Sequence, residues 1–338
     1  MLKLLGQLSN AAGISGNEHE VRGIILKHIK SYITSHSIDK MGNLICFHKG
    51  RGEPVLVTAH MDEIGLMVKH IDEMGHIHFS IVGGITEDTL VSQHVKILLK
   101  QGFINGVISY KELHIDVDSK GLPLYTKMYV DTGLSKKDLV KAGVVPGTYI
   151  IPVSHFTTLG NDNIVAGKAL DDRVGCAILV ELAKRLHKHN QSVYYVFTVQ
   201  EEVGLYGAKT SIYNINPTWA IAVDATCSDD FAHTARGMNK GPAITVKDSE
   251  FIANKCLVDA MVGIAKKKRI PYQLEVSDIG TTDALSIAMS KGGIPTAVLS
   301  IPVRNIHSTV SVAHMNDISG ALTILETLLK RPPRKCIT

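Results

Sequence analysis

Residues 54–62, PVLVTAHMD, combine a run of apolar and β-branched residues with a His-x-Asp sequence where that run ends. Apolar side chains at successive positions, without polar alternation, are typical of a strand that is covered on both faces. His60 and Asp62 therefore lie at the end of a predicted central strand. In open α/β sheets, ligands bind beyond the carboxyl ends of such strands. The stretch predicts a buried parallel strand that carries polar side chains to that edge.

The alternation of strand and helix resumes on the C-terminal side of residue 162. Helices are predicted over 172–187, 254–268, 283–292 and 317–330, with Asp317 as the N-cap of the last, and a further amphipathic helix is predicted over 18–33. Strands are predicted over 192–200, 219–225 and 294–301. This order predicts an α/β fold with a mostly parallel sheet and helices on both of its faces.

Residues 66–160 have a different sequence pattern from the segments on either side. They contain short alternating apolar segments separated by glycine and proline, and no long amphipathic helix. Such a pattern predicts a small β domain. We therefore expect one α/β domain formed by residues 1–65 and 161–338, which is interrupted in the sequence by an inserted β domain over 66–160.

The composition is that of an ordinary soluble globular protein, with 45% hydrophobic and 20% charged residues among 338 and a net charge of +4. The basic run AKKKR at 265–269 has few aromatic residues near it, so we interpret it as the solvated end of a helix. No window holds the ~20 apolar residues that a membrane-spanning helix needs. Neither nucleic acid nor a membrane is expected as a partner.

The chain has five cysteines, at positions 46, 176, 227, 256 and 336. They are odd in number, widely spaced, and form no Cys-x-x-Cys pair. This usage favours reduced thiols over a disulfide framework or a zinc–sulfur site. The N-terminal residues also lack the features of a signal peptide. Together these observations predict a cytoplasmic protein.

Polar residues collect where the predicted strands end. They are His60, Asp62, Asp171, Asp172, Glu201, Glu202, Asp224 and His307. Each has an ordinary explanation when taken singly: a helix cap, a turn residue or a buried histidine with its hydrogen bonds satisfied. As a set, two histidines and three carboxylates suit Zn²⁺, Co²⁺ or Mn²⁺. One tetrahedral ion would not use all five groups, whereas a pair of ions about 3.5–4 Å apart and bridged by one carboxylate would.

The sequence resembles the glutamyl aminopeptidase / tetrahedral aminopeptidase family of dinuclear metallopeptidases over essentially its whole length. The matching stretches are AAGISGNEHEVR (11–22), TAHMDEIGLMV (58–68), GNDNIVAGKALDDRVGC (160–176), TVQEEVGLYGA (198–208), VDAT (223–226), GTTDALSIAMSKGGIPT (280–296) and IPVRNIHS (301–308). Of these, HMDEIG, KALDDR and QEEVG are specific in combination.

The resemblance implies a role for each matching residue. His60, Asp171 and Asp224 would bind one metal, and Asp171 would bridge to a second metal bound by Glu202 and His307. The two divalent ions per chain would be Zn²⁺ or Co²⁺, with Mn²⁺ also compatible. Catalytic roles are expected for Glu201, as the general base, and for Asp62, which would accept the second N–H of His60. The resemblance also implies a cis peptide bond between Asp171 and Asp172.

The family fold is an α/β aminopeptidase domain that carries an inserted PDZ-like β domain. Relatives dimerise through this insertion, and their dimers often assemble into a tetrahedral dodecamer, so a homo-oligomer is expected here. The implied activity is a metal-dependent aminopeptidase, in which Glu201 takes a proton from the attacking water and passes it to the leaving amine. Peptides with a free N-terminus would be the substrates.

Three alternatives stay open at this point. An N-acyl amino-acid or peptide deacylase could use the same two-metal site. A chain of this fold that has lost catalysis could act as a binding module. A glycan hydrolase would instead need two opposed carboxylates about 5–9.5 Å apart and no metal. The residues of the loop 280–283 are read first as a helix cap by Thr281 or Thr282 and second as a wall of the substrate pocket.

Overall fold

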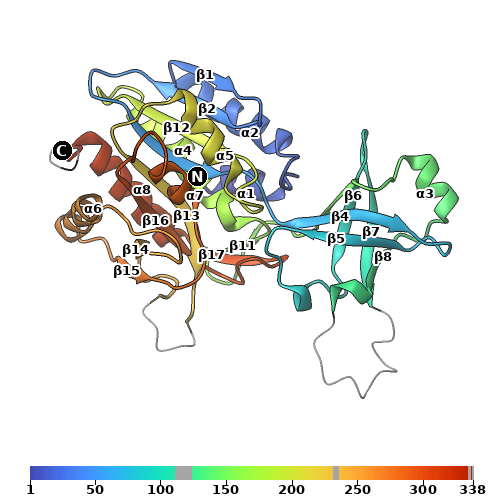
Figure 1. Cartoon of the computed structure of the whole chain (residues 1–338). Coiled ribbons are helices and arrows are strands. Elements are labelled where there is room, and N and C mark those ends of the chain that lie inside the picture. Colours follow the sequence, from blue (N-terminus) through green and yellow to red (C-terminus); the bar gives the residue numbers. More distant parts are fainter. Residues whose placement is uncertain (111–123, 231–235, 334–335, 337–338) are drawn as a thin grey trace.

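The computed structural model describes residues 1–110, 124–230, 236–333 and 336. Its larger part is a twisted sheet packed between helices, and its smaller part is a β-barrel that projects to one side (Figure 1). The barrel strands all come from one continuous stretch of the sequence, between β3 and β10 of the sheet. The architecture is therefore mixed α/β, as the sequence predicts. The exact domain limits of 1–65, 66–160 and 161–338 stay a prediction.

The large sheet has 11 strands. In spatial order they are β1 (Ser35–Ile38), β2 (Leu44–His48), β12 (Val193–Thr198), β3 (Val55–His60), β13 (Ala220–Cys227), β16 (Thr296–Arg304), β17 (Ser311–His314), β11 (Ile164–Gly167) and β10 (Thr157–Thr158), with β14 (Ala243–Lys247) and β15 (Gln273–Val276) branching from β16.

The strands of this sheet are parallel at its centre, where β12, β3, β13 and β16 lie side by side, and in its branch, where β14 pairs with β15. The flanking pairs β1–β2, β2–β12, β16–β17 and β11–β17 are antiparallel. The prediction of a mostly parallel sheet is therefore wrong for the flanking strands. Short connections explain part of the difference, because strands joined by a tight turn, as β1 and β2 are, can pair only in antiparallel fashion. The antiparallel pairs β2–β12 and β11–β17 instead join strands that lie far apart in the sequence.

Helices cover both faces of the sheet, as predicted. The helices are α1 (Leu2–Asn10), α2 (His19–Ile29), α4 (Leu170–Leu186), α5 (Tyr206–Ser211), α6 (Lys255–Lys268), α7 (Asp283–Ala288) and α8 (Met315–Lys330). Strand β3 shows the two faces by simple alternation, because Val55, Val57 and Ala59 join the core under α4 and α8, whereas Leu56 joins a second core under α5 and α7. Burial on both faces accounts for the apolar run of residues 54–59.

The smaller part is a closed barrel with strand order β4-β5-β8-β7-β6-β9. Its strands are β4 (Gly65–Ile71), β5 (Ile77–Val82), β6 (His94–Leu98), β7 (Phe103–Tyr110), β8 (Met128–Asp131) and β9 (Tyr149–Pro152), and one short helix, α3 (Lys136–Ala142), lies between the last two. The barrel has its own apolar core, which includes Leu66, Ile97 and Val130. Closure removes the exposed edges that an open sheet of this size would present.

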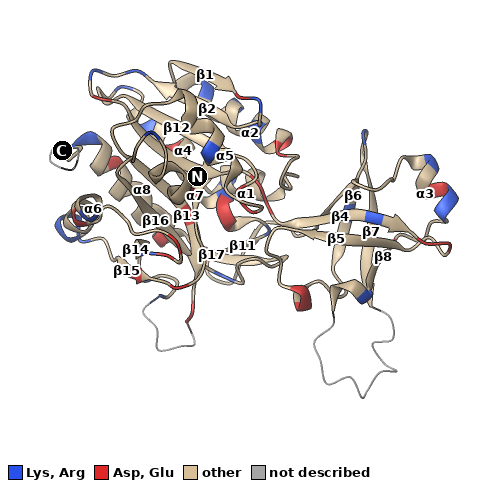
Figure 2. Cartoon of the chain, in the orientation of Figure 1, with Lys and Arg blue, Asp and Glu red and all other residues tan. Residues whose placement is uncertain are grey.

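Charged residues are distributed over both parts of the molecule (Figure 2). The basic run predicted to end a helix forms the last turn of α6, where Lys266, Lys267 and Lys268 are exposed to solvent. The predicted cap of the final helix is wrong: His314 is the N-cap of α8, and Asp317 instead accepts hydrogen bonds from the backbone N–H groups of Asn239 and Gly241. Within the described part of the chain, no helix is long and apolar enough to cross a membrane.

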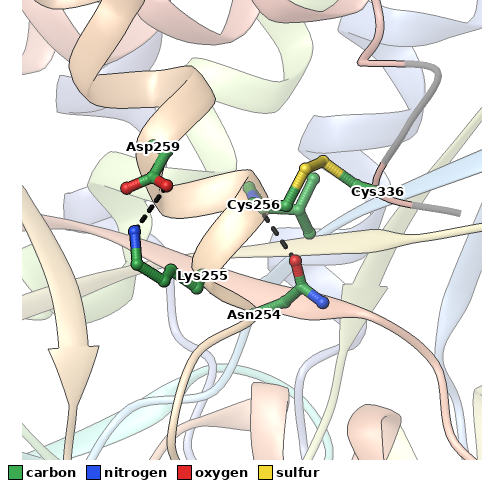
Figure 3. Close-up of a disulfide and its surroundings, with 6 residues drawn as sticks. Asn254, Lys255, Cys256, Asp259 and Cys336 are labelled. Atoms are coloured by element: carbon green, nitrogen blue, oxygen red, sulfur yellow. Dashed lines mark hydrogen bonds and ion pairs between the residues drawn. A yellow bond between two sulfur atoms is a disulfide. The ribbon is translucent and has the colours of Figure 1, made fainter.

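Two cysteines that the sequence reading treats as reduced form a disulfide. Cys256, in the first turn of α6, is bonded to Cys336 near the C-terminus, at a sequence separation of 80 residues (Figure 3). Cys46, Cys176 and Cys227 are free. Wide spacing conceals such a pair, because only the folded chain returns its C-terminal segment to α6. The expectation of reduced thiols is therefore wrong for this pair, and the cytoplasmic location, which rested partly on it, stays a prediction.

Candidate metal centre

The predicted site residues converge at the carboxyl edge of the central parallel strands. His60 is the last residue of β3, Asp224 lies in the second half of β13, and Glu201 and Glu202 follow β12. His307 lies in the turn after β16. Asp171 and Asp172 stand at the start of α4, where the backbone is not yet helical and the peptide bond between them is cis, as the resemblance implies. The chain thus gathers residues up to 247 positions apart in numbering, from His60 to His307, at one edge.

Asp171 stands between the two histidines. Its Oδ1 is 3.1 Å from His60 Nε2, and its Oδ2 is 3.5 Å from His307 Nε2. On the outer sides of this pair, Asp224 Oδ1 is 3.7 Å from His60 Nε2, and Glu202 Oε2 is 3.8 Å from His307 Nε2. Each histidine thus directs its Nε2 atom at the shared aspartate and at one further carboxylate.

The orientation of His307 is fixed by the barrel side of the molecule. Its Nδ1 donates a hydrogen bond of 2.8 Å to the carbonyl of Gly84, and its own carbonyl accepts one of 2.9 Å from the N–H of Thr86. Donation from Nδ1 leaves Nε2 unprotonated in the neutral ring and free to bind a metal. Gly84 lies two residues after the end of β5, so a loop of the barrel completes the site on the sheet.

His60 has a carboxylate behind it instead of a carbonyl. Its Nδ1 lies 3.4 Å from Asp62 Oδ1, and Asp62 is fully buried. This separation is longer than that of an ordinary hydrogen bond, and Nδ1 has no other partner among the described residues. Asp62 also accepts hydrogen bonds from the backbone N–H groups of Glu201, at 3.0 Å, and Glu202, at 3.2 Å. One carboxylate therefore orients the histidine and the turn that carries both glutamates.

Ser15 completes the surroundings of Asp62. Its hydroxyl donates a hydrogen bond of 2.7 Å to Asp62 Oδ2 and is itself buried. The preceding residue, Ile14, forms an isolated parallel bridge with Glu63. The segment after α1 thus runs beside the end of β3 and fixes Asp62 from the side away from the histidine.

Burial disfavours the charged form of most of the site carboxylates and so raises their pKa values. It raises the pKa of Glu202 to about 7, with Asp171 adding to the effect, and it raises the pKa of Glu201 and Asp224 well above their usual range. Asp171 is the exception: burial opposes its ionisation, but the neighbouring His307 and His60 rings hold its pKa below the usual range. Buried carboxylates with unfavourable charge favour the binding of a cation.

The donor atoms fit divalent metal ions. One ligand atom each from His60, Asp171 and Glu202 lie within 4.8 Å of one another, and so do ligand atoms of His60, Asp172 and Asp224. Imidazole nitrogen and carboxylate oxygen are the donors that Zn²⁺, Co²⁺ and Mn²⁺ accept. His60 belongs to both groups, and the buried Oδ2 of Asp172 has no hydrogen-bond partner among the described residues. The arrangement therefore suits a metal centre of more than three ligands.

A cavity of about 560 Å³ opens in front of these groups. The site residues that line it are His60, Asp171, Glu201, Glu202, Asp224 and His307. Gly280, Thr281 and Thr282 form another part of its wall, which agrees with the interpretation of that loop as a wall of the pocket. The interpretation as a helix cap also holds, because the Thr282 hydroxyl accepts the N–H of Ala284 at 3.2 Å and caps α7.

Two residues that support the site, Gly84 and Ser15, were not singled out from the sequence. They act through His307 and Asp62. GISG belongs to a motif of the family resemblance, which is the signal that could have drawn attention to Ser15. Asp283, the last residue of the loop 280–283, is buried beneath the strand ends, where it accepts a hydrogen bond of 2.6 Å from the Thr198 hydroxyl, and burial raises its pKa to about 6.

Comparisons with known proteins agree over the whole chain. A family model described as M42 glutamyl aminopeptidase matches residues 42–324. A putative aminopeptidase of Acetivibrio thermocellus is 41% identical over 328 residues, which is 96% of this chain and 97% of that protein. Among solved structures, aminopeptidase APDkam598 from the archaeon Desulfurococcus kamchatkensis has 35% identity and a TM-score of 0.95, covering 100% of this chain and 96% of that one. The Pyrococcus horikoshii TET1 peptidase, described as able to assemble into a tetrahedron or a large octahedral shell, has 32% identity and a TM-score of 0.89, covering 98% and 99%.

Proposed function

The chain belongs to the M42 glutamyl aminopeptidase family, and we propose that it is a two-metal aminopeptidase that releases N-terminal residues from peptides. The observation that carries this proposal is the position of Asp171, whose two oxygens face two different histidines. A carboxylate in that position suits the bridging role between two ions. His60 and Asp224 would complete one metal site, and Glu202 and His307 the other.

Bound divalent ions would polarise the scissile carbonyl and lower the pKa of water in the site. The chain's own part begins with Glu201, which lines the cavity beside the ligand Glu202. Glu201 would take a proton from the attacking water and pass it to the amine of the leaving peptide. Asp62 would hold Glu201 in place through the backbone hydrogen bond described above.

The barrel also suits the assembly known for relatives. The TET1 peptidase of Pyrococcus horikoshii can assemble into a tetrahedron or a large octahedral shell, and this chain matches it over nearly its full length. We propose that this chain likewise forms a homo-oligomer, with the barrel, which is PDZ-like by resemblance, as its dimerisation domain. The cavity would then open on the interior of a shell and receive peptides that are small enough to enter.

The decisive experiment compares Glu201→Gln with the unmodified protein on aminoacyl chromogenic substrates. We expect kcat to fall by ~10²-fold or more, because Gln cannot accept the proton, while the metal content per chain stays the same. Metal analysis and steady-state kinetics on the same preparations measure both. Near-normal turnover by the variant would remove Glu201 as the base.

The same assay separates the aminopeptidase from a deacylase that uses this site. Substrates with a free α-amino group should be cleaved and their N-acylated counterparts should not. Removal of metal with a chelator should abolish release, and the return of Zn²⁺, Co²⁺ or Mn²⁺ should restore it. Cleavage of the N-acyl substrates alone would favour the deacylase.

A further inference from the structure

The wall of the cavity includes two neighbouring segments that the proposed reaction does not use. Asp248 follows β14, and Thr281 precedes α7; both line the cavity. The segments touch, because the N–H of Ser249 donates a hydrogen bond of 3.1 Å to the carbonyl of Gly280. Both residues also present an atom that lacks a partner: Asp248 Oδ2 and Thr281 Oγ1 are buried and have no hydrogen bond within the described part of the chain.

Only one of the two carboxylate oxygens of Asp248 accepts hydrogen bonds among the described residues. Its Oδ1 accepts hydrogen bonds from the N–H groups of Glu250, at 2.9 Å, and Phe251, at 2.7 Å, which fixes the side chain in the wall. The side chain is 5% exposed, and burial raises the pKa of its carboxyl. Lys247 does not neutralise it, since the Lys247 ammonium bonds to the carbonyls of Asp248 and Ser277 and to Asp278 Oδ1. A buried acceptor oxygen is thus left in the wall of the cavity.

A second acid in the wall provides the contrast. Glu275 is also buried, but both of its oxygens are satisfied: Oε1 by the Thr226 hydroxyl and the Arg236 guanidinium, and Oε2 by the Thr245 hydroxyl. The Arg236–Glu275 ion pair brings no net charge to the wall. Away from the metal ligands and the catalytic base, the acid without a cationic partner is therefore Asp248.

On the basis of the proposed function, we propose that this part of the cavity receives the side chain of a basic N-terminal residue, lysine or arginine, with Asp248 Oδ2 and Thr281 Oγ1 as the acceptors of its cationic group. Ammonium and guanidinium groups carry only donors, which matches two open acceptors. An acidic side chain would meet Asp248 as a like charge. An apolar side chain would leave both acceptors buried without a partner, which is unfavourable.

The direct test is binding without turnover. L-Lysinol and L-norleucinol keep the α-amine, have no scissile bond, and differ only in the ε-ammonium group. Calorimetry on the metal-loaded protein should show lysinol bound at least tenfold more tightly, because only lysinol can pair with the open carboxylate. Equal affinity for the two compounds would overturn the proposal.

Variants test whether Asp248 and Thr281 cause the preference for lysinol over norleucinol. Asp248→Asn keeps an Oδ1 acceptor for the two backbone N–H groups but removes the charge, and it should reduce the preference for lysinol to about twofold or less. Thr281→Val should weaken lysinol binding by a smaller factor. Glu250→Gln is the matched control, since this exposed neighbour loses the same charge outside the cavity; it should keep the full preference. If Asp248→Asn also keeps it, the subsite lies elsewhere and the proposal is wrong.

Hydrolysis separates this proposal from the function on which it rests. Lysyl and arginyl chromogenic substrates should have a higher kcat/KM than leucyl and glutamyl ones, and Asp248→Asn should remove this difference through KM. Fastest cleavage of leucyl or glutamyl substrates would contradict the subsite and keep the aminopeptidase. Preferred binding of lysinol without hydrolysis of any aminoacyl substrate would keep the subsite and contradict the aminopeptidase.

Discussion

The two histidines of the site are held in different ways. His60 is 3% exposed and lies against Asp62, a fully buried carboxylate that also accepts two backbone N–H groups and the Ser15 hydroxyl. His307 is 38% exposed and is held by one backbone carbonyl, that of Gly84. The first support lies within the sheet part of the molecule. The second crosses from the loop after β5 of the barrel.

The difference shows how the two parts of the chain share one site. The half around His60 is built from a network in which each group satisfies several others, so a single change there disturbs several contacts. The half around His307 depends on how the barrel sits against the sheet. A site divided in this way would couple metal binding at His307 to the position of the barrel. The predictions below test this asymmetry.

The largest effect is expected from Asp62→Asn. Both carboxylate oxygens of Asp62 accept backbone N–H groups, so an amide places an NH₂ donor against one of them and also loses the charge behind His60. Metal affinity should fall about 10- to 100-fold, and hydrolysis should fall with it. Competition with a chelating dye measures the affinity.

Asp317→Asn is the matched control for that change. Asp317 is equally buried and also accepts two backbone N–H groups, but it does so at the start of α8. The Asp317→Asn substitution should lower the melting temperature without changing metal affinity. A similar loss of affinity in both variants would mean that Asp62 acts only through general stability.

A smaller effect is expected from Gly84→Ala. A Cβ atom on Gly84 would lie 2.8 Å from His307 Nδ1, so the ring must move. Of two metal-binding steps, the one that involves His307 should lose affinity by on the order of tenfold, while the other is unchanged. Gly160→Ala, where a Cβ atom meets nothing within 4 Å, should behave as the unmodified protein. Loss of both binding steps in Gly84→Ala would argue against two separately supported halves.

Ser15→Ala should have a smaller effect again. It removes one hydrogen bond to Asp62 Oδ2 but leaves the two backbone N–H groups in place. The expected cost of about 1 kcal/mol corresponds to roughly a fivefold weakening of metal binding. Ser211→Ala removes a buried hydroxyl that bonds to the Ala208 carbonyl in α5, and it should leave metal binding unchanged. Ser15→Thr, which keeps the hydroxyl, should restore most of the affinity.

The smallest effect on the metal centre is expected from Cys256→Ser. Its disulfide joins α6 to the C-terminal segment and contacts neither half of the site. The free energy of unfolding should fall by about 2–4 kcal/mol, with no change in metal affinity or kcat. Melting curves with and without a reductant give the comparison, since the variant should not respond to the reductant. A change in metal affinity would show that α6 is coupled to the site.

The sequence predicted those parts of the structure that depend on local pattern. An unbroken apolar run made β3 a doubly covered strand, and each polar residue at the end of such a run reached the same edge of the sheet. Short alternating segments also predicted a small β domain, and the structure shows that this domain is a closed barrel. The pattern did not show that the outer strands are antiparallel, because periodicity reports which side chains are buried and not which strand lies alongside.

By itself, the sequence determined the family, the strand ends and the residues that meet there, because burial period and short motifs are properties of consecutive residues. Only the tertiary structure decided that Gly84 holds His307 and that Asp62 accepts the N–H groups of both Glu201 and Glu202. It also decided that Asp317 accepts a hydrogen bond from the distant Asn239, and that Cys256 and Cys336 form a disulfide. Each of these joins residues far apart in the chain. Such contacts depend on backbone atoms whose positions are fixed only when the whole fold closes, and no local pattern encodes them.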